Sequence, residues 1–161
     1  MQELYELAGR VAVILKARKE TIAVAESSAG GLLSAALLSV PGASAYYLGG
    51  GVVYTKTALK ALLAATRDET KGMRSQTEPY AQFLSSTVRE RFASSWGISE
   101  TGSAGPTATS YAAGHTCVAI AGPNGVEAVQ TIETGNDNRT VNMEAFARAA
   151  LTLLLSKLEQ G

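Results

Sequence analysis

The sequence predicts an α/β protein in which helices cover both faces of a mixed β-sheet, giving three α/β/α layers. Two observations predict it. Apolar residues recur at helical spacing in several segments, beginning with residues 2–18, and short β-branched apolar runs alternate with them. The chain has 161 residues, of which 46% are hydrophobic and 17% charged, as is typical of a compact globular protein. We therefore expect one domain over residues 1–161.

The expected elements follow the order α-β-α-β-α-α-β-β-β-α. The predicted helices are residues 2–18, the segment from Gly30-Gly31 to Pro41, and residues 57–64, 77–94 and 139–157. The predicted strands are residues 21–25, 45–54, 98–103, 115–121 and 126–134. We interpret the second strand as bent or paired and interrupted at Gly49–Gly51, where glycine permits a bulge or a close approach of the backbone. Thr57 is the expected N-cap of the third helix.

Composition and charge exclude several classes of function. Lysine plus arginine equals aspartate plus glutamate, at 14 each, and no basic tract exceeds two residues, so we expect no nucleic-acid partner. The N-terminus lacks the pattern of a signal peptide, and the apolar stretches are too short to span a bilayer, so no membrane partner is expected. The single cysteine, Cys117, cannot form an internal disulfide, which favours a reducing, cytoplasmic location.

His115 and Cys117 lie two residues apart on a predicted strand and therefore face the same side of the sheet. The sequence has no second histidine or cysteine to complete a set of metal ligands. We interpret the pair as part of the core or of a sheet edge, and we expect neither a metal nor a cofactor.

Four segments carry residues suited to chemistry. The first covers residues 26–31, between a predicted strand and a predicted helix, where ligands commonly bind in α/β sheets. Ser27 is a candidate nucleophile if a base lies within reach, and the amides near Gly30 and Gly31 can hold an anion or an oxyanion. The alternative is that Ser27 or Ser28 merely caps the helix.

The other three segments also lie at the ends of predicted elements. Tyr54 and a nearby lysine could transfer protons together, or they are an aromatic strand end followed by a solvated lysine. The loop Gly102–Thr107 has amides that could face an anion, or it is a structural turn. Arg139 could clamp a phosphate with its planar guanidinium, or Gly135–Arg139 is a capped helix start with a solvated arginine.

Six segments, taken in order, resemble the C-terminal domain of the CinA family (competence/damage-inducible protein A), also known as the nicotinamide-nucleotide amidase family. They are Thr21–Gly31, Pro41–Tyr47, Gly50–Thr55, Thr77–Pro79, Gly102–Pro106 and Gly114–Ala119. The first matches a glutamate-serine-x-x-glycine-glycine signature, and the fifth matches a glycine-x-alanine-glycine-proline loop. The family's members often carry an additional N-terminal domain for which this sequence has no room, so we carry over no function tied to that domain.

The resemblance implies the same three-layer fold and hydrolysis of nicotinamide mononucleotide to nicotinate mononucleotide and ammonia, by a serine–lysine mechanism without a metal. Mapped onto this sequence, it implies Ser27 as the nucleophile, with Tyr54 and Lys60 as the other catalytic residues. The substrate-binding residues that it implies are Glu26, Gly30, Gly31, Thr55, Gly102, Ala104, Gly105 and Arg139. The expected partners are a pyridine nucleotide and further copies of the chain in a homo-oligomer.

The sequence departs from the family pattern where the lysine is expected. In the family this lysine lies five residues after the tyrosine, but here that position is Leu59, with Lys60 one place later and Lys56 three places earlier. One residue along a helix is a rotation of about 100°, so the side chains of neighbouring residues point in different directions. The last family motif, glycine-aspartate-arginine, is also altered, to Gly135–Arg139. The alternative function is therefore a catalytically impaired nucleotide-binding or regulatory domain.

Overall fold

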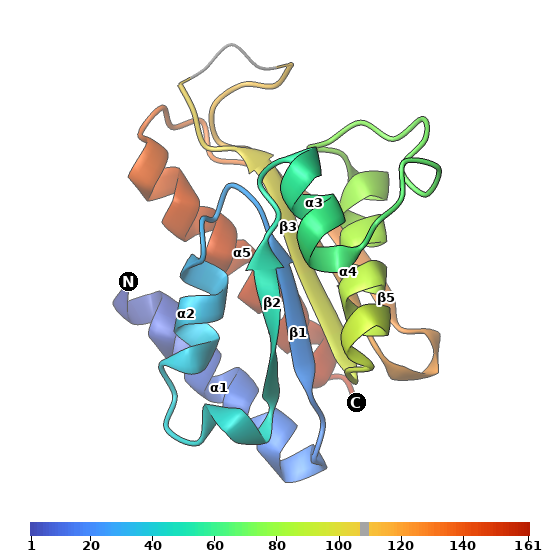
Figure 1. Ribbon diagram of the computed structural model, residues 1–161. Coiled ribbons are helices and arrows are strands. Elements are labelled where there is room, and N and C mark those ends of the chain that lie inside the picture. Colours follow the sequence, from blue (N-terminus) through green and yellow to red (C-terminus); the bar gives the residue numbers. More distant parts are fainter. Residues whose placement is uncertain (107–109) are drawn as a thin grey trace.

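The computed structural model describes residues 1–106 and 110–161 and contains a five-stranded sheet with the strand order β2-β1-β3-β4-β5 (Figure 1). The strands are β1 (Ile22–Glu26), β2 (Tyr47–Val52), β3 (Trp96–Ser103), β4 (His115–Ala121) and β5 (Glu127–Glu133). β1 runs parallel to β2 and β3, whereas β4 is antiparallel to β3 and β5. The sheet is therefore mixed, as predicted. Thr107, part of a predicted loop, lies outside the described residues.

Helices cover both faces of the sheet, which confirms the predicted α/β/α layers (Figure 1). One face carries α1 (Gln2–Arg18), α2 (Leu32–Leu38) and α5 (Arg139–Leu158). The other face carries α3 (Lys56–Leu63) and α4 (Glu78–Phe92). Short 3-10 turns lie at Ala43–Ala45 and Pro123–Gly125. None of the described helices combines the length and the apolar character needed to cross a bilayer.

Alternation along β1 divides the interior into two cores. Ile22 and Val24 pack into the larger core with α1, α2 and α5. Ala23 and Ala25 face the opposite way and pack with α3 and α4. Every residue of β1 is buried, which explains why its sequence is a continuous apolar run ending in Glu26 rather than an alternating pattern.

The chain order creates a switch point at the carboxyl ends of β1 and β3. From β1 the chain crosses through α2 to β2, and it then returns through α3 and α4 to β3 on the other side of β1. Because the two connections cover opposite faces, the carboxyl ends of β1 and β3 form the switch point of the sheet, which is where ligands bind in open α/β sheets. The segments that follow Glu26 and Ser103 lie at this switch point.

The glycines of β2 do not interrupt the strand, which corrects that part of the prediction, whereas the close backbone approach also predicted for them is found. Gly49–Gly51 lie inside β2 and pair with β1, and the register shift falls at Leu48 instead. A Cβ atom at residue 50 would lie 2.1 Å from the carbonyl oxygen of Val24. The close approach of the two strands therefore requires glycine at that position.

The N-cap of α3 is Thr55 rather than Thr57, a second correction. The Thr55 hydroxyl accepts a hydrogen bond from the Ala58 amide at 3.1 Å, and the helix begins at Lys56. The hydroxyl of Thr55 thus already serves the helix, and its predicted contact with a substrate stays a prediction.

Candidate active site at the carboxyl ends of the parallel strands

A turn, Ser27–Gly31, joins β1 to α2 at this edge of the sheet. The Val53 amide donates to the Glu26 carbonyl at 2.7 Å, so pairing between β1 and the chain after β2 continues up to the turn. Ser27 is partly exposed, whereas Ser28 is buried. Of the two serines, Ser27 is therefore the one that a ligand can reach.

Glu26, the last residue of β1, caps α2 with its side chain. Its carboxylate accepts hydrogen bonds from the amides of Gly31 (2.7 Å), Leu33 (3.1 Å) and Ser34 (2.9 Å), and from the Ser34 hydroxyl (2.7 Å). These amides at the start of a helix otherwise lack partners, and the helix dipole favours a carboxylate there. Glu26 is fully buried. Glu26 is therefore a structural cap, and its predicted contact with a substrate stays a prediction.

Glu100, on β3, holds the other side of the turn. Its carboxylate accepts hydrogen bonds from the amides of Ser27 (3.1 Å) and Ala29 (2.8 Å) and from the hydroxyls of Ser28 (2.5 Å) and Thr116 (2.9 Å). The side chain is fully buried, and this burial raises the pKa of Glu100 although the four donors oppose the rise. Glu100 is absent from the predicted site. An acidic residue inside a strand of otherwise uncharged residues is the signal that points to it.

The amides of Gly30 and Gly31 are not free to bind an anion. The Gly30 amide donates to the Ser27 carbonyl at 3.0 Å, and the Gly31 amide donates to Glu26 at 2.7 Å. This corrects the anion-binding role predicted for both glycines. Among the described residues, the amide of Ser28 is the one in this turn for which no acceptor is recorded. It directly follows Ser27 in the sequence, and it is the donor that the turn can offer to a ligand.

Tyr54, Gly105 and Arg139 meet at the same edge, although they come from three different parts of the chain. The Arg139 guanidinium donates to the Tyr54 hydroxyl at 3.2 Å and to the Gly105 carbonyl at 3.3 Å. Tyr54 is 57% exposed and Arg139 is also exposed. The structure thus brings these three predicted residues together, with Tyr54 and Arg139 at the surface and Gly105 buried beneath them.

Gly102 and Ala104 have a supporting position instead. Both are buried. The side-chain amide of Gln76 donates to the Gly102 carbonyl at 3.1 Å, and that of Asn142 donates to the Ala104 carbonyl at 2.9 Å. These hydrogen bonds fix the course of the chain that leads to Gly105, and the substrate contacts predicted for Gly102 and Ala104 stay predictions.

The serine turn also packs against the end of α5 that carries Arg139. A Cβ atom at Gly30 would lie 2.6 Å from the Cε atom of Met143. Met143 lies about one helical turn beyond Arg139. The turn that holds Ser27 and the cluster around Arg139 therefore border one another at the carboxyl ends of β1 and β3.

Residues 4–158 match the family model of the CinA C-terminal domain. The chain belongs to the CinA C-terminal domain family. It is 36% identical over 161 residues to a CinA-like protein of Synechococcus sp. (strain CC9902) and 37% identical over 151 residues to one of Anaeromyxobacter sp. (strain Fw109-5). The alignments cover 96% and 92% of this chain but 38% and 36% of those proteins. The chain thus spans little more than a third of their length.

Solved structures of CinA proteins share this fold over almost their whole length. The competence/damage inducible protein CihA from Agrobacterium tumefaciens matches with a TM-score of 0.89 and 26% identity, covering 98% of this chain and 96% of that chain. The competence damage-inducible protein A (ComA) from Klebsiella pneumoniae subsp. pneumoniae MGH 78578 matches with a TM-score of 0.88 and 26% identity, covering 97% of both chains.

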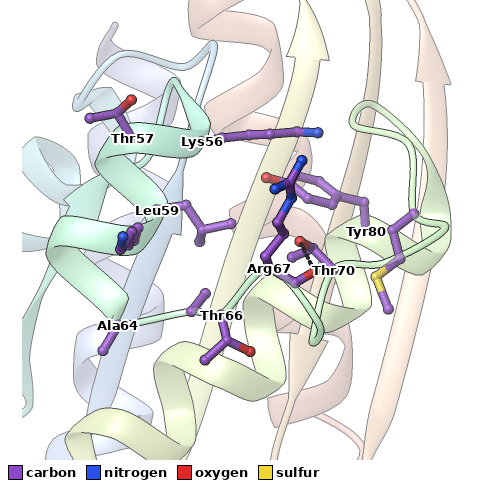
Figure 2. A pocket seen from close by; sticks show the side chains of 11 residues that line it. Lys56, Thr57, Leu59, Ala64, Thr66, Arg67, Thr70 and Tyr80 are labelled. Carbon is purple, nitrogen blue, oxygen red and sulfur yellow. Dashed lines mark hydrogen bonds between the residues drawn. The ribbon is translucent and has the colours of Figure 1, made fainter.

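Leu59, where the resemblance leads us to expect the family lysine, lines a cavity of about 760 Å³ (Figure 2). The cavity lies between α3, residues 64–73 and Tyr80 of α4, and is here called the α3 cavity. Leu59 is 3% exposed. Lys60 lines the same cavity, so its one-residue offset does not remove it from there. Within the described part of the chain, no hydrogen bond joins Ser27 to a lysine, and Ser27 is not among the residues lining the cavity. The structure does not join the predicted nucleophile and the predicted base.

β4 is buried along its whole length, and the side chains of His115 and Cys117 are buried on it, away from a sheet edge. The His115 ring lies between the Glu133 carboxylate and the Gln76 carbonyl, 2.8 Å from the latter, and stacks on Tyr111 at 4.1 Å. Burial raises the pKa of the Cys117 thiol. In the described residues, no group of three histidine, cysteine or acidic side chains is arranged to hold a metal ion.

Proposed function

We propose that this chain is an amidohydrolase that converts nicotinamide mononucleotide to nicotinate mononucleotide and ammonia, with Ser27 as the nucleophile. One observation carries the proposal. Glu100 fixes the Ser27 amide and the two residues that follow, while the Ser27 hydroxyl has no hydrogen-bond partner among the described residues. A nucleophile needs this combination of a fixed backbone and an available hydroxyl. The resemblance to the nicotinamide-nucleotide amidases supports the choice of substrate.

The proposed reaction proceeds through an acyl-enzyme. Ser27 Oγ attacks the carboxamide carbon while a base takes its proton, which gives a tetrahedral intermediate with a negatively charged oxygen. The proton then passes to the carboxamide nitrogen, ammonia leaves, and an ester joins Ser27 to the nicotinoyl group. Water, deprotonated by the same base, attacks the ester and releases the carboxylate. The Ser28 amide is the proposed oxyanion donor, a kind of contact worth about 3 kcal/mol.

Arg139 is the proposed phosphate-binding residue. A guanidinium presents five N–H groups, and the contacts with Tyr54 and Gly105 hold it in place without using all of them. The Tyr54 hydroxyl accepts from Arg139, so its own proton can point to a ligand or assist proton transfer.

Lys60 is the proposed base, and Lys56 is the alternative. Lys56 precedes Leu59 by three residues and Lys60 by four, so each of them lies next to Lys56 on the surface of α3. Both lysines are exposed, and neither has an ion pair within the described part of the chain, so both can change rotamer. We expect Lys60→Ala to lower kcat by about 10²-fold or more and Lys56→Ala to have a smaller effect. If Lys56→Ala lowered kcat more than Lys60→Ala, Lys56 would be the base. If neither substitution changed kcat, neither lysine would be the base.

The proposal is tested by following ammonia release from nicotinamide mononucleotide, with Ser27→Ala as the matched control. Turnover by the native chain and its loss in the variant would support Ser27 as the nucleophile. Full turnover by Ser27→Ala rejects that assignment. A native chain that binds the nucleotide without releasing ammonia rejects the amidase activity.

A second candidate function is a nucleotide-binding or regulatory domain without catalysis. The observation that favours it is the buried Leu59 at the position where the family lysine is expected. Thermal unfolding with and without pyridine nucleotides separates the two functions. A ligand at 100 times its dissociation constant stabilises the folded state by about 2.7 kcal/mol. Stabilisation without ammonia release would select this second function.

We further propose that the protein acts in the cytoplasm as a homo-oligomer. β2 ends the sheet, and its exposed Leu48 and Val52 are apolar. An exposed edge strand is a natural surface for pairing with a second copy. The free thiol of Cys117 suits a reducing compartment. Light scattering after size exclusion tests the homo-oligomer, and a monomer at all concentrations rejects it. Cell fractionation tests the cytoplasmic location.

A further inference from the structure

The α3 cavity carries positive charge that no carboxylate compensates. Lys56, Lys60 and Arg67 line it, and its described lining includes no acidic residue. None of the three forms an ion pair within the described part of the chain. Glu69, in the same segment, is engaged elsewhere, because its carboxylate accepts from the Thr66 amide at 2.8 Å and pairs with Arg91 at 3.3 Å. This cavity therefore favours an anion.

The cationic groups converge on one part of the cavity. Figure 2 shows the side chains of Lys56 and Arg67 extending into it toward the Tyr80 hydroxyl. Tyr80 is largely buried, and burial raises the pKa of its phenol, so the hydroxyl stays protonated and can donate. Two like charges that face one space repel each other, and an anion between them removes that repulsion. A phosphate group suits the planar fork of an arginine together with two further donors.

The remaining walls favour an organic phosphate over a bare phosphate ion. Leu59, Ala65 and Met73 give the cavity an apolar side, next to the hydroxyl-bearing Thr57 and Thr70. Its volume of about 760 Å³ lies within the range of roughly 300–1,000 Å³ that small-molecule pockets occupy. We propose that the α3 cavity binds a small organic phosphate such as a nucleoside monophosphate. Arg67 and Lys56 bind the phosphoryl group, and the apolar side contacts the organic part.

Binding of an organic phosphate here goes beyond the proposed function, although the proposed base Lys60 and its alternative Lys56 line the same cavity. The described residues that line the cavity include neither Ser27 nor Arg139. The inference requires binding and no turnover, so it is tested in the Ser27→Ala protein, where amide hydrolysis cannot interfere. Lys60 is left unchanged in the test because it is the proposed base.

The test is calorimetric titration of the full chain at low ionic strength with adenosine monophosphate, adenosine and inorganic phosphate. We expect adenosine monophosphate to bind at least about 10-fold more tightly than either fragment. Arg67→Gln is expected to weaken this binding by about 10- to 100-fold, because it removes charge-assisted hydrogen bonds. Arg67→Lys keeps the positive charge but lacks the planar guanidinium, so it should weaken the binding of adenosine monophosphate less than Arg67→Gln does. The matched control is Lys71→Gln, an exposed cation of the same segment that does not line the cavity.

Three results overturn the proposal. One is the absence of binding by adenosine monophosphate. Another is an equal loss of affinity in Arg67→Gln and Lys71→Gln, which indicates unspecific attraction by surface charge. The third is binding that survives Arg67→Gln but is lost in Arg139→Ala, which would put the nucleotide in the proposed active site. Tyr80→Phe is an independent variant that removes one donor and keeps the ring, and it should also lower the affinity. Thermal unfolding of each variant verifies that it is folded.

Discussion

Glu100 Oε1 accepts a hydrogen bond from the Ser28 hydroxyl at 2.5 Å, across a sequence separation of 72 residues. The other oxygen of the same carboxylate accepts from the amides of Ser27 and Ala29, on either side of Ser28. Burying a carboxylate is costly unless donors satisfy its oxygens, and here two amides and two hydroxyls do so. The backbone around the proposed nucleophile is therefore set by a side chain of β3.

Two substitutions of Glu100 are expected to have very different effects on folding. Glu100→Ala leaves two amides and two hydroxyls without their acceptor, so it should lower the free energy of unfolding by about 3 kcal/mol or more. Glu100→Gln should be tolerated better. Its amide oxygen can accept from the two backbone amides, and its NH₂ group can donate to the hydroxyls of Ser28 and Thr116. Urea unfolding at pH 7 measures both, and equal losses would contradict this account.

Glu100 also predicts how stability depends on pH. Burial raises the pKa of the folded-state carboxyl above 4.5. Its contribution to stability is therefore fully present below the unfolded pKa and is lost as the pH rises through the folded pKa. We expect the native chain to lose stability relative to Glu100→Gln as the pH rises above that of an unperturbed carboxyl, by about 1.4 kcal/mol per unit of pKa difference. Unfolding at pH 4.5 and 8 tests this, and a constant difference between the proteins argues against it.

Alanine substitutions of the two serines in the turn should distinguish an effect on catalysis from an effect on stability. Ser27→Ala is expected to lower kcat by about 10³-fold or more while changing the free energy of unfolding by less than about 0.5 kcal/mol. Ser28→Ala removes a hydroxyl that donates to Glu100, so it should lower that free energy by about 1–2 kcal/mol. Ammonia release and thermal unfolding of both variants measure these effects. A Ser27→Ala protein as destabilised as Ser28→Ala would show that the Ser27 hydroxyl is structural.

Much of the fold could be predicted because the patterns that define it are local. The predicted bounds of α1 and β4 both agree with the structure, because each follows from an apolar period within one segment. The choice between Thr55 and Thr57 as the N-cap of α3 could not be made in that way. Both threonines precede apolar helical residues, and only the geometry of the chain after β2 shows which one caps.

The candidate site shows where prediction from sequence stops. Ser27, Tyr54 and Arg139 follow or begin elements, so their shared location follows from the topology of an α/β sheet. The roles of Glu26 and Gly31 depend on which backbone amides donate to the carboxylate of Glu26 and which donate to that of Glu100. That assignment is settled by the packing of α2 and β3 against β1, which no local pattern encodes.

Arg139 and Tyr54 should affect different kinetic constants. Arg139→Ala is expected to raise KM by about 10- to 100-fold, because it removes charge-assisted hydrogen bonds to the phosphate. Arg139→Lys should raise KM almost as much as Arg139→Ala, since lysine lacks the planar guanidinium that reaches both Tyr54 and Gly105. Tyr54→Phe keeps the ring and should lower kcat more than it raises KM if the phenol assists proton transfer. Steady-state kinetics decides this, and an unchanged KM in Arg139→Ala removes Arg139 from the substrate site.

Gly105 and Gly72 form a matched pair for testing how rigid the loop after β3 must be. Both have φ of +79°, so alanine meets the same backbone strain at either position. At Gly72 no atom lies within 4 Å of an added Cβ, whereas at Gly105 the Cβ atom of Ala113 would lie at 2.1 Å.

Gly72→Ala should therefore lower the free energy of unfolding by about 1 kcal/mol, and Gly105→Ala by about 3 kcal/mol or more, because the loop has to move. The Gly105 carbonyl accepts from Arg139 at 3.3 Å, so that movement should also displace the guanidinium. We expect KM for the nucleotide to rise in Gly105→Ala and to stay at the native value in Gly72→Ala. Equal changes in stability and KM for the two variants would mean that backbone strain alone matters and that the loop does not position Arg139.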